Sequence, residues 1–256
     1  MSLADVASAT GISKPKLGQL ERGTYNVGPD ELEQILSACR ASDADIARLK
    51  THATRPRGRP WWYRWASVVP DWFGLYLGLE GMARSMFVYE PSVVHGLVQT
   101  RGYATAVTSV ASLVRPADVS RQVELRMQRS QRLVEQNPLE YTLILEEGAL
   151  RRMPPEPMTM REQLDHLLLM GCRANVQIRV LPTDRALHAG MTVGQFALFD
   201  MGDLGTVAHA ETFGDASYIR DIDKLESYCD AARYLSDEAL TVAETKGLIA
   251  EMGKAI

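Results

Sequence analysis

The side chains best suited to recognising another molecule are Lys14, Lys16 and Gln19. They fall on the outer face of a predicted helix, close to its N-terminal end. A lysine ammonium donates hydrogen bonds to guanine or to phosphate, whereas a glutamine amide both donates to and accepts from the edge of a base. We expect this face to enter the major groove of duplex DNA.

Two short helices must position these three residues, and the segment that encodes them runs from residue 3 to residue 20, LADVASATGISKPKLGQL. Ala7 is small enough for the helices to pack closely, and Gly11 follows where a left-handed turn costs glycine nothing. Ser13 can cap the second helix, and Pro15 is tolerated in its first turn. Apolar contacts between the helices come from Val6, Ile12, Leu17 and Leu20. The spacing predicts a helix-turn-helix; the alternative is an ordinary helical hairpin in a globular core.

The residues that follow extend this all-α region to residue 53. A polar loop comes after the second helix, and we expect Arg22, Tyr25 and Asn26 to contact phosphates there. A third helix opens at Pro29, with acidic residues in its first turn, and a fourth opens near residue 42. The sequence therefore predicts a helix-turn-helix DNA-binding domain over residues 1–53.

This succession of helices resembles the xenobiotic-response-element class of bacterial regulators, and the resemblance implies DNA binding. In that class another helix precedes the pair and covers its apolar face, whereas here Met1 stands almost at the first helix of the pair. The first helix of the class is thus apparently missing. We expect Val6, Leu17 and Leu20 to lack part of their cover, unless translation starts upstream or another surface of the chain packs there.

Charge and composition limit the classes of protein to which the chain can belong. Hydrophobic content of 46% and charged content of 23% are typical of a soluble globular protein. Residues 1–60 carry nine Lys/Arg and seven Asp/Glu, hence +2, while the remainder carries −6 of the total of −4. This distribution suits a protein that meets DNA with one end only. No apolar run is long enough to cross a bilayer and no signal-peptide pattern occurs, so we expect a cytoplasmic protein without membrane contact.

Residues 54–74 read as a linker that joins two domains. Its first part is rich in proline, glycine and arginine and cannot form a regular helix. The four tryptophans of the chain follow within twelve residues: Trp61, Trp62, Trp65 and Trp72. Such a cluster either binds a ligand, a partner or bases, or anchors the linker to the next domain. We take these four residues as the candidate site for a ligand or partner.

Residues 75–256 alternate between helical and strand patterns and predict a mixed α/β domain, so that the whole chain is of the α+β class. The expected strands are 87–89, 140–146, 176–181, 195–199 and 205–210. The expected helices are 75–86, 116–136, 160–173, 221–232 and 236–252. The helix over 116–136 is expected to turn four arginines toward solvent, Arg121, Arg126, Arg129 and Arg132.

The second domain shows little sign of catalysis. His209 and Glu211 would share one face of a strand and, with His188, could form a metal site, but no third ligand has diagnostic spacing. The paired acids Glu146 and Glu147 at a strand end are common on surfaces. Three scattered cysteines, and no GxSxG, P-loop or GxGxxG motif, complete this picture. We therefore expect no enzyme, no cofactor and no metal; the alternative is a metal-dependent enzyme or sensor with a vestigial helix-turn-helix.

The larger domain resembles the WhiJ-like regulators of actinobacteria, which join a helix-turn-helix to a C-terminal domain of undefined function. The residues that carry this resemblance are Tyr89–Pro91, Gly96–Thr100 with Tyr103-Ala104, Gln163-Leu164, Val180–Pro182 and the ending Tyr228–Leu240. The resemblance implies transcription regulation and pairing with a small protein encoded nearby, sometimes as an antitoxin. A single helix-turn-helix reads one half-site, so we also expect a homodimer on a double-stranded operator.

Overall fold

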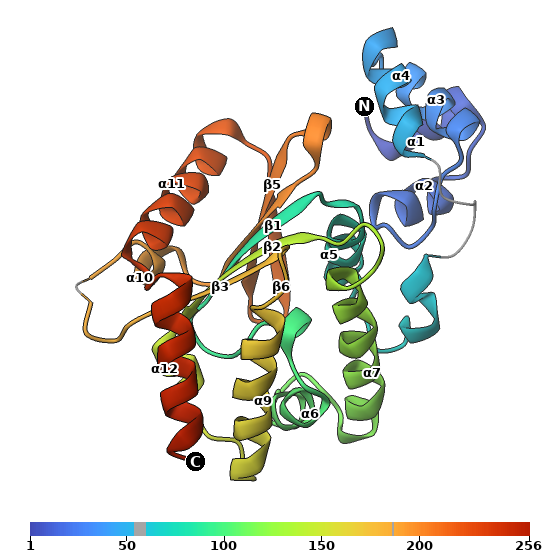
Figure 1. Ribbon diagram of the computed structural model, residues 1–256. Helices are drawn as coiled ribbons and strands as arrows, with labels where there is room; N and C mark the ends of the chain where they lie inside the picture. The colour runs from blue at the N-terminus through green and yellow to red at the C-terminus, as the bar shows by residue number, and fades with distance from the viewer. Residues whose placement is uncertain (54–59, 186) are drawn as a thin grey trace. The chain divides into compact units, whose positions relative to one another are not determined.

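The computed structural model describes residues 1–53, 60–185 and 187–256. The chain forms two compact units, Met1–Gly78 and Leu79–Ile256 (Figure 1). The expected basic stretch at 54–59 lies outside the described residues. None of the helices in the described parts is long and apolar enough to cross a membrane.

The first unit is helical, as the sequence predicts. Its helices are α1 (Leu3–Thr10), α2 (Lys14–Glu21), α3 (Pro29–Ala38), α4 (Asp43–His52), the 3-10 helix η1 (Trp61–Trp65) and the first part of α5 (Asp71–Met82). Ser2 caps α1 and Ser42 caps α4 through side-chain oxygens, and proline occupies the first turn of α2 and α3.

The apolar face of the α1–α2 pair is better covered than the sequence suggests. Val6 and Leu17 are buried and Leu20 is half-buried, so another surface of the chain covers the first two, an alternative that the sequence left open. A segment distant in sequence packs at the end of α2: a Cβ on Gly74 of α5 would lie 3.1 Å from the carbonyl oxygen of Arg22. Packing of this kind joins residues some fifty positions apart, and helical periodicity carries no information about it.

The second unit is built on one six-stranded sheet of order β3-β2-β1-β4-β5-β6. The strands are β1 (Ser85–Glu90), β2 (Glu140–Glu146), β3 (Val176–Leu181), β4 (Phe196–Asp200), β5 (Thr206–Thr212) and β6 (Asp215–Ile219). β1, β2 and β3 are parallel, whereas β4, β5 and β6 join by antiparallel pairing. The mixed α/β prediction is confirmed; β6 was missed because its polar residues lack the alternation of a half-buried strand.

Helices cover both faces of the sheet (Figure 1). On one face α11 packs Ala231, Ala232 and Leu235 against strand residues that include Tyr89 and Phe196. The other face carries α6, α7 and α9. The helices of this unit are α6 (Arg101–Ser109), α7 (Val119–Ser130), α8 (Glu147–Arg151), α9 (Pro157–Met170), α10 (Gly190–Val193), α11 (Ile222–Glu238) and α12 (Val242–Lys254). Short 3-10 helices are η2 (Gly96–Val98), η3 (Pro116–Asp118), η4 (Gln131–Leu133) and η5 (Gly202–Leu204).

Candidate nucleic-acid interface

A sharp turn between α1 and α2 sets the direction of the second helix. Gly11 adopts φ 71°, the left-handed conformation expected for glycine at this position, and its N–H donates to the carbonyl of Ala7. Ser13 occupies the N-cap position of α2, as predicted, but its side chain makes no capping hydrogen bond. The turn is therefore held by backbone geometry and by the proline in the first turn rather than by the serine hydroxyl.

The three residues expected to read DNA differ in their surroundings. Lys14 and Gln19 are exposed on α2. Lys16 is half-buried: its Nζ donates to Oε1 of Glu31 over 2.5 Å and lies 5.1 Å from the ring centroid of Tyr25. A cation at this distance from an aromatic ring is attracted by the ring quadrupole. Of these three residues, two are thus exposed and the third is a lysine engaged by the rest of the unit.

The residues expected to contact phosphates follow α2 directly. Arg22 is exposed at the end of the helix, whereas Tyr25 and Asn26 are half-buried. The loop is ordered by Thr24, whose N–H and hydroxyl both donate to the carbonyl of Gln19. This arrangement fixes the loop to the helix that carries the predicted base-reading residues.

The tryptophans are not one exposed cluster. Trp62 and Trp65 are buried, Trp61 is 40% exposed and Trp72 is half-buried. Trp61 and Trp65 meet edge to face at 6.1 Å, and Arg64 stacks on Trp65. A Cβ on Gly74 would lie 3.2 Å from the Trp62 ring, so this ring packs directly on the backbone of α5. The exposed aromatic side chains of the segment are Trp61 and Tyr63, and Trp72 is partly accessible.

The arginines of α7 and η4 correct the prediction of a solvent-facing basic helix over 116–136. Arg129 is buried, and its Nε and Nη2 donate to the two carboxylate oxygens of Glu80 at 2.9 and 2.7 Å. Arg126 donates to Gln99, and Arg132 donates to the carbonyls of Ala83 and Asn137. Of the four, Arg121 alone is exposed. Helical periodicity failed here because a paired arginine can occupy a core position.

Sequence reasoning also missed Glu80 and Glu90, and for Glu80 a signal was present. Glu80 is the one charged residue in α5 after its first position, in the run DWFGLYLGLEGM. An acid alone in an apolar helix is expected to be buried and paired. Glu90 ends the buried strand β1, where it accepts from Nε2 of Gln195 at 3.0 Å. Nothing in its position distinguishes it from a solvated strand end.

Burial perturbs the ionisable groups around these residues. Burial, with a smaller effect of Glu211, raises the pKa of Glu90 to about 8. Burial and the charge of Arg129 lower the pKa of His95 well below its usual range and that of His209 to about 4. The His95 Nδ1 lies 2.6 Å from the hydroxyl of Tyr141. Near neutral pH this sheet face therefore holds neutral histidines beside a protonated glutamic acid.

The possible metal trio of His188, His209 and Glu211 is not assembled. The His188 ring lies against Tyr89 on the α11 face, and its Nε2 is 3.2 Å from Oε1 of Glu146. Ala208 points into the same α11 core, so its neighbour His209 points to the opposite face of the sheet. Throughout the described ranges no group of three His, Cys, Asp or Glu side chains is arranged to hold a metal ion.

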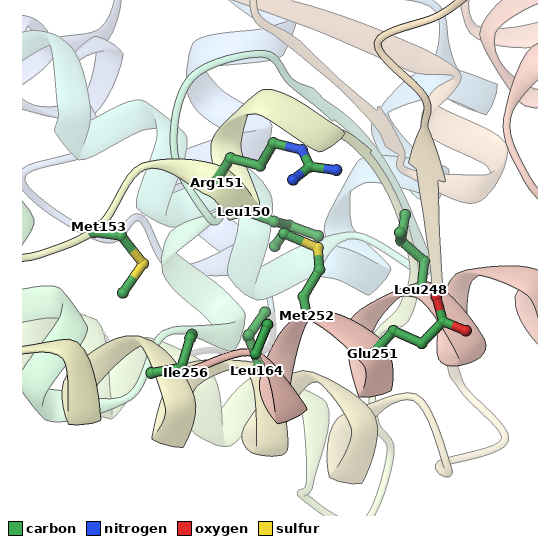
Figure 2. A pocket seen from close by; sticks show the side chains of 9 residues that line it. Leu150, Arg151, Met153, Leu164, Leu248, Glu251, Met252 and Ile256 are labelled. Carbon is green, nitrogen blue, oxygen red and sulfur yellow. The ribbon is translucent and has the colours of Figure 1, made fainter.

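A cavity of about 350 Å³ opens between α8, α9 and α12 (Figure 2). Its walls are mainly apolar, with Leu150, Leu164 and Met252 at the centre of the view and Arg151 and Glu251 as the charged residues. The remaining lining residues are Met153, Leu248, Ala255 and Ile256. The volume lies in the range of small-molecule sites.

Fold and site together define a helix-turn-helix protein with an appended α/β domain. Residues 1–49 match a helix-turn-helix domain family, and residues 73–251 match a domain family of unknown function, DUF5753. The second match covers most of the chain, which thus belongs to the DUF5753 family. No functionally described protein and no solved structure matches the chain significantly. The helix-turn-helix assignment makes DNA binding and transcription regulation the functional class of the N-terminal unit.

Proposed function

We propose that the protein is a sequence-specific transcriptional regulator of the xenobiotic-response-element class, similar to the WhiJ-like regulators of actinobacteria. The observation that carries the proposal is the α1–turn–α2 arrangement, which leaves Lys14 and Gln19 exposed on the second helix. The helix-turn-helix family match of residues 1–49 supports it. Lys14 and Gln19 contact bases or phosphates through α2, and Ser13 begins that helix. Lys16, which the sequence predicts to act with them, is paired with Glu31 in the free protein. Arg22, Tyr25 and Asn26 contact the DNA backbone.

A mobility shift tests this function on the DNA upstream of the protein's own gene, with a scrambled duplex as competitor. We expect the full chain to prefer the upstream DNA, and Lys14→Ala to weaken that complex. Arg121→Ala removes the same charge from an exposed site on α7 and is the matched control. Equal losses for the two variants, or no preference for the upstream DNA, would contradict the assignment of α2.

We further propose that the regulator acts as a homodimer, because a single helix-turn-helix reads one half-site and two-fold symmetry supplies the second. Light scattering at micromolar protein, together with binding to DNA that carries one or two half-sites, tests this. Strong binding of a monomer to a single half-site would contradict the dimer.

The part of the chain that follows the helix-turn-helix is proposed to bind a small protein encoded nearby, in the manner of an antitoxin, or a small ligand. Two places are candidates: the tryptophan segment with Trp61, Trp62, Trp65 and Trp72, and the cavity beside Met252. Binding there changes the affinity for DNA, and linkage requires DNA to change the affinity for the partner by the same factor.

Two substitutions separate these places. Trp61→Ala removes the most exposed indole, whereas Met252→Trp fills the cavity. Co-purification of the neighbouring small protein with each full-length variant gives the readout. Loss with Trp61→Ala alone favours the tryptophan segment, and loss with Met252→Trp alone favours the cavity. Retention by both variants would remove both places from the proposal.

We also propose that the protein catalyses no reaction, uses no cofactor and works in the cytoplasm. The absence from the sequence of nucleophile-elbow, P-loop and dinucleotide motifs supports the first part. Metal analysis of the purified chain tests the proposal: a stoichiometric transition metal would contradict it and favour a metal-dependent sensor or enzyme.

A further inference from the structure

An ion pair joins α2 to the helix that follows it in the helix-turn-helix unit. Nζ of Lys16 donates to Oε1 of Glu31 over 2.5 Å, and the Lys16 side chain is 34% exposed while that of Glu31 is 9% exposed. The same ammonium lies over the Tyr25 ring at 5.1 Å. Lys16 is thereby held between α3 and the loop that follows α2. It is half-buried, in contrast to the exposed residues Lys14 and Gln19.

Glu31 is an unfavourable choice for stability alone. Its Oε2 is buried without a hydrogen-bond partner among the described residues. A buried acceptor without a partner destabilises the folded state, and the N-terminal position of Glu31 in α3 offsets this only in part. Groups of this kind in folded proteins call for a functional explanation.

We propose that Glu31 lowers the sequence-independent affinity for DNA by holding Lys16 back from the DNA backbone. An ammonium already paired with a carboxylate displaces fewer counterions from DNA, so it adds less affinity for any sequence. The contacts of Lys14 and Gln19 with bases keep their full contribution. A contribution shared by all sequences cancels in the difference between two affinities, so this pairing weakens binding to every duplex and leaves the preference for the operator unchanged. This inference rests on the proposed DNA-binding function.

Glu31→Gln tests it, because the amide keeps the shape of the side chain and removes its charge. The readout is fluorescence anisotropy of the full chain on a random-sequence duplex at several salt concentrations. Release of Lys16 to one phosphate steepens the dependence of log K on log salt by about 0.9, which is an extra loss of roughly 3.5-fold between 50 and 200 mM salt. The ratio of affinities for upstream and random DNA stays the same, because both duplexes gain the phosphate contact.

Glu33→Gln is the matched control. Glu33 lies on the same helix and pairs with Lys50 at 2.5 Å, but its side chain is 48% exposed and its partner is on α4. The two substitutions change the net charge equally. Equal slopes for the two variants would assign the effect to net charge and overturn the proposal, and so would weaker binding by Glu31→Gln, since Glu31 would then prepare Lys16 for contact.

Lys16→Met keeps the proposal testable even where Glu31→Gln perturbs folding. A lysine held back contributes little, so Lys16→Met leaves the salt slope on random DNA unchanged, and Glu31→Gln has no further effect in its background. A slope reduced by about 0.9 in Lys16→Met alone overturns the inference. Failure of the wild-type chain to bind any duplex would instead contradict the proposed function itself.

Discussion

The two units of the chain each contain an ion pair between helices, and the pairs are built for different tasks. In the helix-turn-helix unit one lysine nitrogen meets one oxygen of Glu31, and a third of the lysine side chain stays exposed. In the α/β unit Arg129 binds both oxygens of Glu80, and neither side chain is more than 6% exposed. The first pair can exchange partners with DNA or solvent, whereas the second can do so only by opening the core. The first pair is therefore accessible to an incoming ligand, whereas the second stabilises the folded core.

The largest effect is expected from Glu80→Ala. The substitution leaves the Arg129 guanidinium buried without its counter-charge, which costs about 3–5 kcal/mol of unfolding free energy. Hydrogen exchange of amides in α7 measures the loss locally, without assuming that both units unfold together. Glu135→Ala removes a 50% exposed partner of Arg132 and should cost less than about 1 kcal/mol. Similar protection in the two variants would show that the buried pair is not a stabilising contact.

Gln19→Ala tests the exposed surface of α2 in the helix-turn-helix unit. We expect a loss of about 1–3 kcal/mol of binding free energy on the upstream DNA, little change on random DNA and little change in stability. Arg22→Ala should instead weaken binding to all sequences and flatten the salt dependence. Anisotropy with the two duplexes distinguishes the variants. Equal losses on both duplexes for Gln19→Ala would show that Gln19 does not read bases.

The stability of the α/β unit should depend on pH, because its interior contains ionisable groups with shifted pKa values. Burial raises the pKa of Glu90 to about 8, so between its unfolded value and 8 the folded chain holds a proton that the unfolded chain releases. Stability therefore falls as pH rises through this window, by at most about 1.4 kcal/mol per unit. The depressed pKa values of His95 and His209 act oppositely, but only below about 6.5.

The range from pH 6.5 to 8 consequently lies above the effect of the histidines and reports on the carboxyl groups whose pKa desolvation raises, namely Glu90 and Glu211. Denaturation of the wild type should show declining stability there, and Glu90→Gln should make the profile flatter. A wild-type profile that rises or stays level over this range would contradict the raised pKa.

The smallest effect is expected from Ser13→Ala. Ser13 stands at the N-cap of α2 without a capping hydrogen bond, whereas the Ser42 oxygen accepts from the N–H of Asp45 at 3.1 Å. Ser42→Ala should cost about 1 kcal/mol, and Ser13→Ala clearly less. Thermal unfolding of the first unit, monitored by the circular dichroism signal of its helices, compares the two variants. An equal or larger cost for Ser13→Ala would mean that its hydroxyl does cap the helix.

The sequence was most informative where structure is local. The Gly11 turn, the proline-initiated helices and the strands over 140–146 and 176–181 follow from neighbours a few residues apart, and all were predicted. The predicted DNA-contacting residues fall on α2 and the following loop, but the engagement of Lys16 by Glu31 was not foreseen. That contact spans fifteen positions and depends on how α3 packs.

The buried ion pair inside the α/β unit could not be predicted from the sequence, because it joins residues that are even farther apart along the chain. Glu80 and Arg129 are 49 positions apart, and although the apolar helix around Glu80 indicates a buried acid, nothing near it in sequence identifies Arg129 as its partner. The assignment of Arg129 to a basic surface failed on that account. The idea of a metal site failed because alternation along β5 sends His209 away from the face that holds His188.

The helix α5 belongs to both units, since the division of the chain falls after Gly78. Gly74 packs on Arg22 and Trp62 in the first unit, while Glu80 holds Arg129 in the second. A proline between Gly74 and Glu80 would break α5, so a single substitution there would disturb packing in both units. A fragment that lacks its part of α5 would likewise lose contacts that its unit makes in the full chain.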